Sequence, residues 1–351
     1  MPSSVLVSFP GPARNQRLGT LVRKGMLKPC PNAFGAMPWV QPGRAAESVI
    51  SIVELSGGWS NAAQIDWAIA RARDTEAVGV TDVEFQLRAG CKLLLDGVLR
   101  LLATCNQLVG NGKRVRLVFG GGQCGVMGYI DRMGFFDHLD ARVETVPDRP
   151  VVSGAKIFRG GNTGLLEIVP IAAGRRDDDL PDRLTTALRH ACSARSDAVA
   201  LSEAASTLFS ELIGNVHDHT QTNGHVALQV YQGGSKVQVV VCDDGPGLMG
   251  TLRPALIERS DAHVHLTDVQ LLVEMFREGL SRHSDAKHGQ GLKDCATKAI
   301  RFRAELDVRL ARQNVRLSPS RGAYEPTTAH WSEGLPLLRG THIAFAFRLA
   351  T

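Results

Sequence analysis

The sequence predicts an α/β protein made of two domains. From Val49 onward, short apolar segments of strand length alternate with longer segments whose apolar residues recur at helical spacing. A stretch rich in proline, glycine and charge, residues 140–164, separates two such groups of elements. The length of 351 residues is sufficient for two hydrophobic cores. We therefore expect a basic Pro-rich arm at residues 1–47, an α/β domain at 48–140, a linker with a first strand at 141–178, and a second α/β domain at 179–351.

The first residues differ from the rest of the chain in charge. Residues 1–44 hold six basic and no acidic residues, so they contribute +6 to the net charge of +5 and the remainder contributes −1. The basic residues are Arg14, Arg17, Arg23, Lys24, Lys28 and Arg44. Two interpretations remain open: an irregular arm lying on the protein or on a partner, and an arm that binds nucleic acid. We favour the first, because no recognition motif accompanies the charges.

The composition also indicates in which cellular compartment the protein works and whether it binds a transition metal. No apolar run approaches the length of a membrane span, and the short apolar run Val5–Phe9 has no basic segment before it. We therefore expect a protein with no membrane anchor and no signal peptide. Seven cysteines occur without a Cys-x-x-Cys pair, which indicates reduced thiols in a cytoplasm. The scattered histidines lack a third partner at ligand spacing, so we expect no transition-metal site.

The first domain is expected to alternate strands and helices. Cys91–Val109 is predicted as a long apolar helix that ends at Gly110-Asn111-Gly112. The motif Gly120-x-Gly122-x-x-Gly125 matches the glycine spacing of a dinucleotide-binding fingerprint. That fingerprint belongs after the first strand of its fold, whereas this motif follows the third strand and precedes a short helix, so we interpret it as a turn. The other predicted elements are strands Val49–Leu55, Val83–Leu87 and Arg114–Phe119, and helices Asn61–Arg73 and Val126–Met133.

The second domain is expected to place several strands after two helices. Leu208, Leu212 and Val216 mark one face of a helix over Leu201–Thr220. Two further helices are predicted: one is opened by Pro181 and reaches about Ala194, and one runs from about Thr267 to Gly279 within the long segment 248–288. The predicted strands are Leu165–Ile171, His225–Tyr231, Lys236–Cys242, Ala304–Arg312 and Thr341–Leu349. Residues 318–339 are expected to form a Pro/Gly-rich excursion.

Four short motifs in this second domain carry chemical groups. Glu211 and Asn215 are four residues apart, so they share one helix face, and Asp218 lies about one turn further. The other three motifs are Asp243-x-Gly245-x-Gly247 at a strand end, Gly289-x-Gly291-Leu292 before a helix, and Gly340-Thr341 before the last strand. Each motif alone recurs by chance, but four in this order on these elements are a specific pattern.

These motifs resemble a known kind of ATP site, that of the GHKL family, and each residue type has a chemical reason to stand in such a site. An amide oxygen such as that of Asn215, together with phosphate oxygens, fits the preference of Mg²⁺ for oxygen ligands. Glu211 is placed to act as a base for an attacking water. A buried carboxylate such as Asp243 can accept a hydrogen bond from the amino group of adenine. Gly245 and Gly247 allow close backbone approach, and a helix start after Gly289 and Gly291 favours phosphate.

The four motifs resemble the ATP site of the GHKL family, which comprises gyrase, heat-shock chaperones, histidine kinases and MutL. The resemblance covers about residues 179–351 and implies a Bergerat-type α/β sandwich that binds ATP and Mg²⁺. It also implies that Thr341 supports Asp243 through water and that residues 248–288 form a lid over the ATP. Arg282 and Lys287 of that lid either reach the terminal phosphate or remain solvated; the sequence does not decide between these.

The first domain resembles a STAS domain, the fold of anti-sigma-factor antagonists. The resemblance rests on the strand VEFQL, the helix that follows it, the strand GKRVRLVF and the segment YIDRMGFF; the three quoted segments begin at Val83, Gly112 and Tyr129. The phosphorylatable serine that such domains carry after the central strand is replaced here by Arg88-Ala89-Gly90-Cys91. We therefore do not expect this half to be phosphorylated by its own ATP module.

Three functions follow from these resemblances. The first is an ATPase that acts as a conformational switch for a partner or an assembly. The second is a serine/threonine protein kinase of the anti-sigma-factor type that acts on a separate STAS protein. The third is a scaffold that binds ATP without turnover. We favour the first and expect a homo-oligomer or a protein partner to complete the site.

Overall fold

The computed structural model describes residues 49–350, apart from residues 73, 221, 232, 234, 282–289 and 319–328. The side chains of residues 218–220, 290 and 329–331 also lie outside this description. The predicted N-terminal arm and the predicted lid residues Arg282 and Lys287 are therefore not described, nor is Gly289 of the third motif. Residues 47–351 form one compact unit.

The first group of elements forms a parallel sheet. Among the described residues it contains β1 (Val49–Leu55), β3 (Val80–Leu87), β5 (Arg114–Phe119) and β6 (Glu144–Val146), in the order β1-β3-β5-β6. Buried and exposed residues alternate along β1 and β5, because only one face of the sheet is covered by the core. Since β6 joins this sheet, the sheet extends beyond the predicted boundary at residue 140.

Two helices that run in the same direction, α1 (Ala62–Arg71) and α2 (Leu95–Gly110), cover that sheet. Asn61 and Gln64 form a capping box that begins α1. The prediction of one helix over Cys91–Val109 is wrong at its start: residues Cys91–Leu93 form the short strand β4, which pairs with β2 (Gly58–Ser60). Shorter helices follow, namely α3 (Val126–Arg132), α4 (Phe135–His138) and α5 (Gly154–Phe158).

The second group of elements forms an antiparallel sheet of seven described strands. Their order is β12-β11-β10-β13-β9-β8-β7. The strands are β7 (Leu165–Ile171), β8 (Gly224–Tyr231), β9 (Lys236–Asp243), β10 (Glu305–Leu310), β11 (Gln313–Leu317), β12 (Ala329–Ser332) and β13 (His342–Arg348). The predicted excursion at 318–339 thus contains a strand, β12, and the predicted strand Ala304–Arg312 is the shorter β10.

Helices cover one face of this second sheet. They are α6 (Leu180–Ala191), α7 (Ala198–Thr220), α8 (Gly247–Glu258), the 3₁₀ helix η2 (Ala262–His265), α9 (Asp268–Glu278) and α10 (Gln290–Arg301). Leu208, Leu212 and Val216 of α7 are buried there with Val239 and Val241 of β9. The prediction for residues 248–288 missed α8, which begins directly at Gly247.

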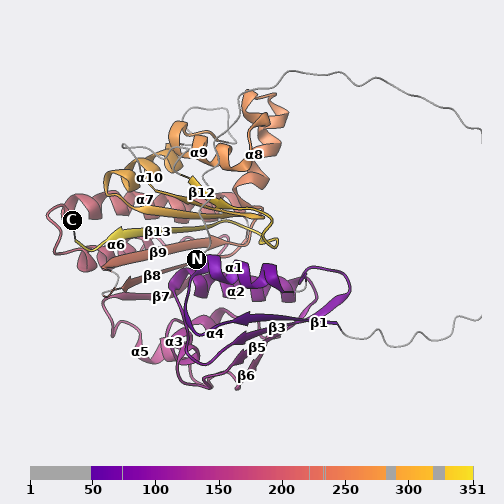
Figure 1. Cartoon of the computed structure of the whole chain (residues 1–351). Coiled ribbons are helices and arrows are strands. Elements are labelled where there is room, and N and C mark those ends of the chain that lie inside the picture. Colours follow the sequence, from indigo (N-terminus) through magenta and orange to yellow (C-terminus); the bar gives the residue numbers. More distant parts are fainter. Residues whose placement is uncertain are drawn as a thin grey trace, which may run out of the picture. The chain divides into compact units, whose positions relative to one another are not determined.

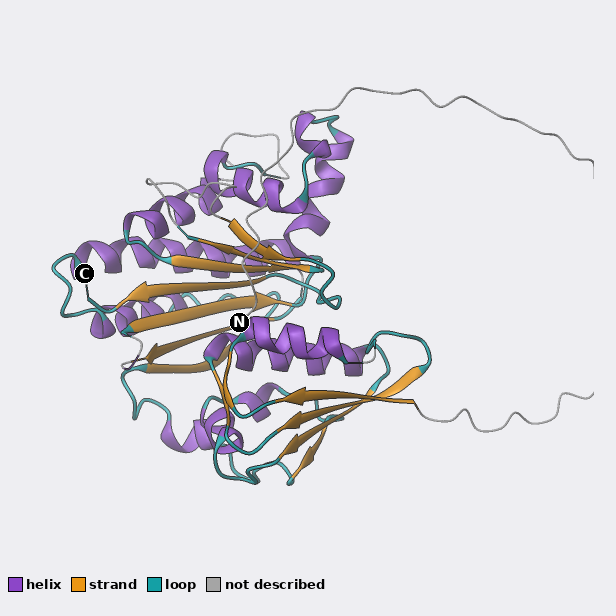
Figure 2. Cartoon of the chain, viewed as in Figure 1, coloured by secondary structure: helices purple, strands orange, loops and turns teal. Residues whose placement is uncertain are grey.

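The opposite face of the seven-stranded sheet is covered by α1 and α2, so the described chain has four layers (Figures 1 and 2). Ala227, Val240, Cys242 and Ala344 of that face share a core with Leu99 and Leu102 of α2 and with the parallel sheet. α2 therefore lies between two sheets, and most of its circumference is buried. This explains why its sequence is apolar without a narrow stripe, because both sides need apolar contacts.

A buried charge cluster joins α1, α2 and β10 within this interface. The carboxylate of Asp66 accepts hydrogen bonds from Arg100 and from Arg309, the latter at 3.1 Å from Nε. All three side chains are nearly inaccessible, with exposed fractions of 3% or less. Burial lowers the pKa of Arg309 to about 10. A buried charge left without its partner is costly, so removing any one of these three side chains should be strongly destabilising.

No helix in the described part of the chain combines the length and the apolar character needed to cross a membrane.

Acid should weaken the contact between the two halves at His225. The rings of His225 on β8 and His138 on α4 pack edge to face, with 5.1 Å between their centroids. Burial lowers the pKa of His225 from 6.5 to about 4. Between these values the unfolded chain binds a proton that the folded protein does not, so the free energy of unfolding falls as the pH drops from 6.5 to 4. We expect His225→Phe to remove about 2 kcal/mol of that loss, allowing for the partial exposure of the side chain.

Urea denaturation at pH 7 and pH 5, on both proteins, measures this effect. The effect is the difference between the two proteins in how much their free energy of unfolding changes from pH 7 to pH 5. The change in one protein alone is not sufficient, because the pKa of Asp243 is raised to about 6 in the folded protein, so its protonation stabilises the fold over the same pH range. The same loss of stability in both proteins would remove His225 from the acid response.

Candidate functional site

The candidate site is centred on Asp243, the last residue of β9. Its Oδ1 accepts a hydrogen bond from the amide of Gly245 at 2.8 Å, and its Oδ2 accepts one from the amide of Thr341 at 3.2 Å. The backbone amide of Asp243 donates to the carbonyl of Thr341 at 3.0 Å. The hydroxyl oxygen of Thr341 accepts from the amide of Leu248 at 3.1 Å, which ties the start of α8 to the same point. Two motifs 98 residues apart thus form one corner.

Two glycines allow this corner to close. Gly340 has a φ of +80°, and a Cβ built on it would overlap the carbonyl oxygen of Asp243. Gly247 has a φ of +74°, and a Cβ there would lie 2.8 Å from the carbonyl oxygen of Gly340. A side chain at either position would separate the two backbones, so glycine is required by close approach as well as by conformation.

The carboxyl group of Asp243 is buried and electrostatically costly. Burial raises its pKa to about 6, while the hydrogen bonds from Gly245 and Thr341 act in the opposite direction. Above that pH the group is an ionised acceptor in a largely dry corner, where a donor on a ligand would gain more than it does in water.

A second part of the site lies where α7 meets α10. The carboxylate of Glu211 is exposed on α7, and a Cβ built on Gly291 would overlap its Oε2, so the start of α10 rests directly on this side chain. Asn215 is partly buried one turn further along α7. Leu292, the last residue of the third motif, packs against the apolar core and thereby seats α10.

Close packing connects this second part to the corner. Gly224, at the start of β8, lies under α7: a Cβ there would be 2.8 Å from Val216 Cγ1 and 2.5 Å from the carbonyl oxygen of Cys242. Asn215 precedes Val216 and Asp243 follows Cys242. The carboxamide and the buried carboxylate are thereby positioned on neighbouring elements, α7 and β9.

Not every predicted site residue can be located. Asp218 lies on α7, but its side chain is outside the described part, as are Arg282, Lys287 and Gly289 entirely. Among described side chains no group of three or more histidine, cysteine or acidic residues is arranged to hold a metal. The single carboxamide of Asn215 nevertheless suits Mg²⁺ that is carried mainly by phosphate oxygens and water, because this ion needs few protein ligands.

Sequence reasoning missed the segment that leads into Gly340. Residues 335–339, which we call the strap, are buried at Leu335 and Leu338 and bonded through their backbone to Ala311 and Arg312. The strap carries no motif, because its interactions use backbone groups that every residue has.

A scan against known family models and a search of characterised proteins found no match to this chain.

Proposed function

We propose that the chain is a Mg²⁺-dependent ATPase whose residues 179–351 form a Bergerat-type nucleotide domain of the GHKL class. The observation that carries the proposal is the corner at Asp243, where a buried carboxylate is held by the amides of Gly245 and Thr341 beside the contact of Gly340 with Asp243. Such a carboxylate suits the amino group of adenine, because that group is a hydrogen-bond donor.

Hydrolysis is assigned to α7. Glu211 takes the proton of the attacking water, the water oxygen bonds to the terminal phosphorus, and ADP leaves with the electrons of the broken P–O bond. Asn215 would contribute one oxygen ligand to Mg²⁺, which supplies charge neutralisation at the phosphates when it is bound. The start of α10 lies against Glu211, and backbone amides of a helix N-terminus would suit the phosphates.

The N-terminal half is proposed to be a STAS-like domain that communicates ATP occupancy to a protein partner or a further copy of the chain. Its parallel sheet and the extensive contact of α2 with the second sheet support this role. Arg282 or Lys287, or a group of the partner, would supply the cation that phosphoryl transfer needs. An arm at residues 1–47 that contacts a partner or nucleic acid remains part of the proposal.

One experiment with labelled ATP separates the candidate activities. Release of labelled phosphate by the purified protein with Mg²⁺ supports the ATPase. Transfer of the label to a STAS protein supports a serine/threonine kinase instead. Tight retention of ATP without turnover supports a binding scaffold. Failure to bind ATP at all would contradict the proposal in every form.

Adenosine binding should require the ionised form of Asp243. We expect affinity to be full at pH 7.5 and to fall as the pH is lowered through about 6, the pKa of this group. Asp243→Asn should weaken binding roughly tenfold or more at pH 7.5, because a hydrogen bond to a charged acceptor is lost, and should abolish the pH dependence. Calorimetry with adenosine avoids the titration of the phosphates. Equal affinity in wild type and variant would show that the adenine site lies elsewhere.

A further inference from the structure

One side chain of α2, that of Gln107, forms hydrogen bonds to the strap. The carboxamide of Gln107 donates from Nε2 to the carbonyl oxygen of Leu337 and accepts at Oε1 from the amide of Arg339, both at 2.7 Å. It therefore pairs with the strap as another peptide group would. Two residues beyond Arg339 stands Thr341, whose amide holds Asp243.

A second connection runs through the buried charge cluster. Arg309 donates to Asp66 of α1 and, from Nη2, to the carbonyl oxygen of Pro336 in the strap at 2.6 Å. On the other side of the strap, Leu335 and Leu338 donate their amides to the turn between β10 and β11. The strap is thus bonded to its own sheet by the amides of Leu335 and Leu338 and by Arg309 of β10, which also pairs with Asp66 of α1. It is bonded to α2 through Gln107.

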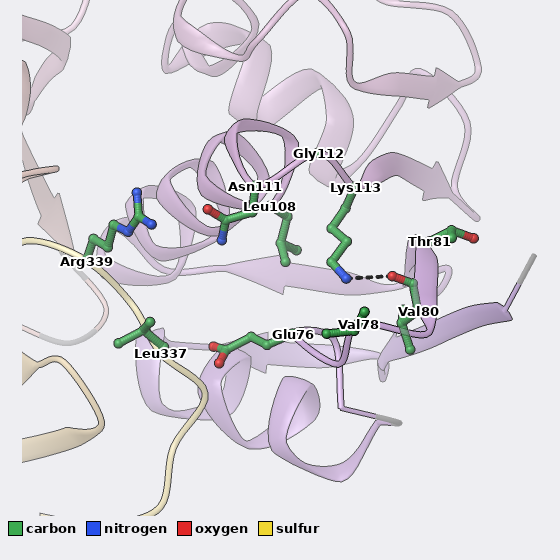
Figure 3. Close-up of a pocket in the computed structure, with 10 residues that line it drawn as sticks. All are labelled: Glu76, Val78, Val80, Thr81, Leu108, Asn111, Gly112, Lys113, Leu337 and Arg339. Atoms are coloured by element: carbon green, nitrogen blue, oxygen red, sulfur yellow. Dashed lines mark hydrogen bonds between the residues drawn. The ribbon is translucent and has the colours of Figure 1, made fainter. Parts of the chain in front are cut away.

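The geometry of the strap shows why Gln107 matters more than packing at its end. Leu335 and Leu338 are buried, but Leu337 is only partly buried and Arg339 is exposed. Beside them lies a groove of about 530 Å³, and Figure 3 shows Leu337 and Arg339 on one side of it with Lys113 and Val80 on the other. Open space lies on that side of the strap, so Leu337 and Arg339 are held toward α2 by the two hydrogen bonds to Gln107. Leu338 between them is held by its burial and by the hydrogen bond from its amide to Ala311.

We propose that Gln107 is a positioning residue for the nucleotide site: it holds the strap so that Gly340 and Thr341 close on Asp243, and it makes the α1–α2 layer part of that site. This inference rests on the proposed adenine-binding role of Asp243. Because linkage is reciprocal, a ligand that needs the closed corner also stabilises the attachment of the strap to α2. The N-terminal half thereby senses the occupancy of the nucleotide site through one carboxamide.

The test compares Gln107→Ala with Asn106→Ala in the full chain. Asn106 is the preceding residue of α2, and its carboxamide also makes two hydrogen bonds to backbone, at His138 and Asp140, but both lie within the N-terminal half. The two variants should lose similar stability. Only Gln107→Ala should raise the dissociation constant for adenosine, about fivefold, because the closed corner becomes a smaller fraction of the population.

Hydrogen exchange provides a readout that does not depend on affinity. Adenosine should slow exchange of the Arg339 amide in wild type, and much less in Gln107→Ala. Equal adenosine affinity in Gln107→Ala and Asn106→Ala, in a wild type that binds adenosine, would overturn the inference while leaving the proposed function intact. No binding by wild type would instead overturn the proposed function.

Discussion

Glu211→Gln is expected to lower the rate of ATP hydrolysis at least about a hundredfold while leaving ATP affinity nearly unchanged. Glutamine keeps the shape of the side chain beside Gly291 but cannot take a proton from water, and loss of a general base costs on the order of a hundredfold to ten-thousandfold. Phosphate release under saturating ATP and Mg²⁺ measures the rate, and calorimetry with ATP measures the affinity. Asn215→Ala should behave differently, by weakening binding that depends on Mg²⁺.

The contact of Gly291 with Glu211 provides a control on position. Gly291→Ala should push the carboxylate aside, because the added Cβ would overlap Oε2, and should slow hydrolysis although Glu211 is still present. Gly214→Ala lies on α7 between Glu211 and Asn215, where a Cβ meets nothing within 4 Å, and should have no such effect. If Glu211→Gln hydrolyses ATP as fast as wild type, Glu211 is not the base.

Gly340→Ala is expected to destabilise the protein by about 3 kcal/mol or more and to remove adenosine binding. The positive φ alone costs an alanine about 1 kcal/mol or more. The overlap of the new Cβ with the backbone of Asp243 adds a cost of overpacking, on the order of 1–3 kcal/mol, since backbone atoms cannot turn aside. Opening the corner also removes the amide of Thr341 from the carboxylate. Urea denaturation and adenosine calorimetry measure the two effects.

Gly334→Ala is the matched control for this change. Gly334 has a similar φ of +69°, but a Cβ there meets nothing within 4 Å. An alanine with a positive φ costs a similar free energy at both positions. The difference in stability between the two variants therefore measures the effect of the close approach of Gly340 to Asp243. Similar stability and similar adenosine affinity in the two variants would mean that this approach does not hold the corner together.

The sequence predicted best the elements whose ends carry local signals. The helix expected from Thr267 to Gly279 is α9, with Thr267 capping its first turn and Gly279 in a left-handed conformation at its end. The apolar run Lys236–Cys242 predicts a strand, and β9 extends one residue further, to Asp243; its apolar residues are buried on both faces of the sheet, as such a continuous run indicates. Such signals depend on neighbours in the chain.

Two elements escaped prediction because tertiary packing overrides local preference. α8 begins at Gly247 and contains Pro254, both unfavourable in a helix, yet Leu252 and Leu256 are buried in the core and hold it. Residues Cys91–Leu93 continue the apolar pattern of α2, and only their pairing with β2 makes them a strand.

In the candidate site, too, some residues could be predicted from the sequence and others could not. Its motifs could be read from the sequence because Asp243, Gly247 and Gly340 are residue types that the chemistry demands. The role of Gln107 could not, since its partner is backbone 230 residues away and a single glutamine in an apolar helix has no distinctive spacing. The predicted lid residues and the arm remain predictions.

The place of β13 in the sheet has a consequence for biosynthesis. β13 lies between β10 and β9, at the interior of the seven-stranded sheet, yet it is translated after both. While the ribosome is still making residues 244–341, β9 presents an unpaired edge and Asp243 has no Thr341 to hold it. Unpaired edges on nascent chains invite association with other chains. The sheet can close only when residues 342–348 leave the ribosome, so the late arrival of one central strand sets the moment at which the corner at Asp243 first exists.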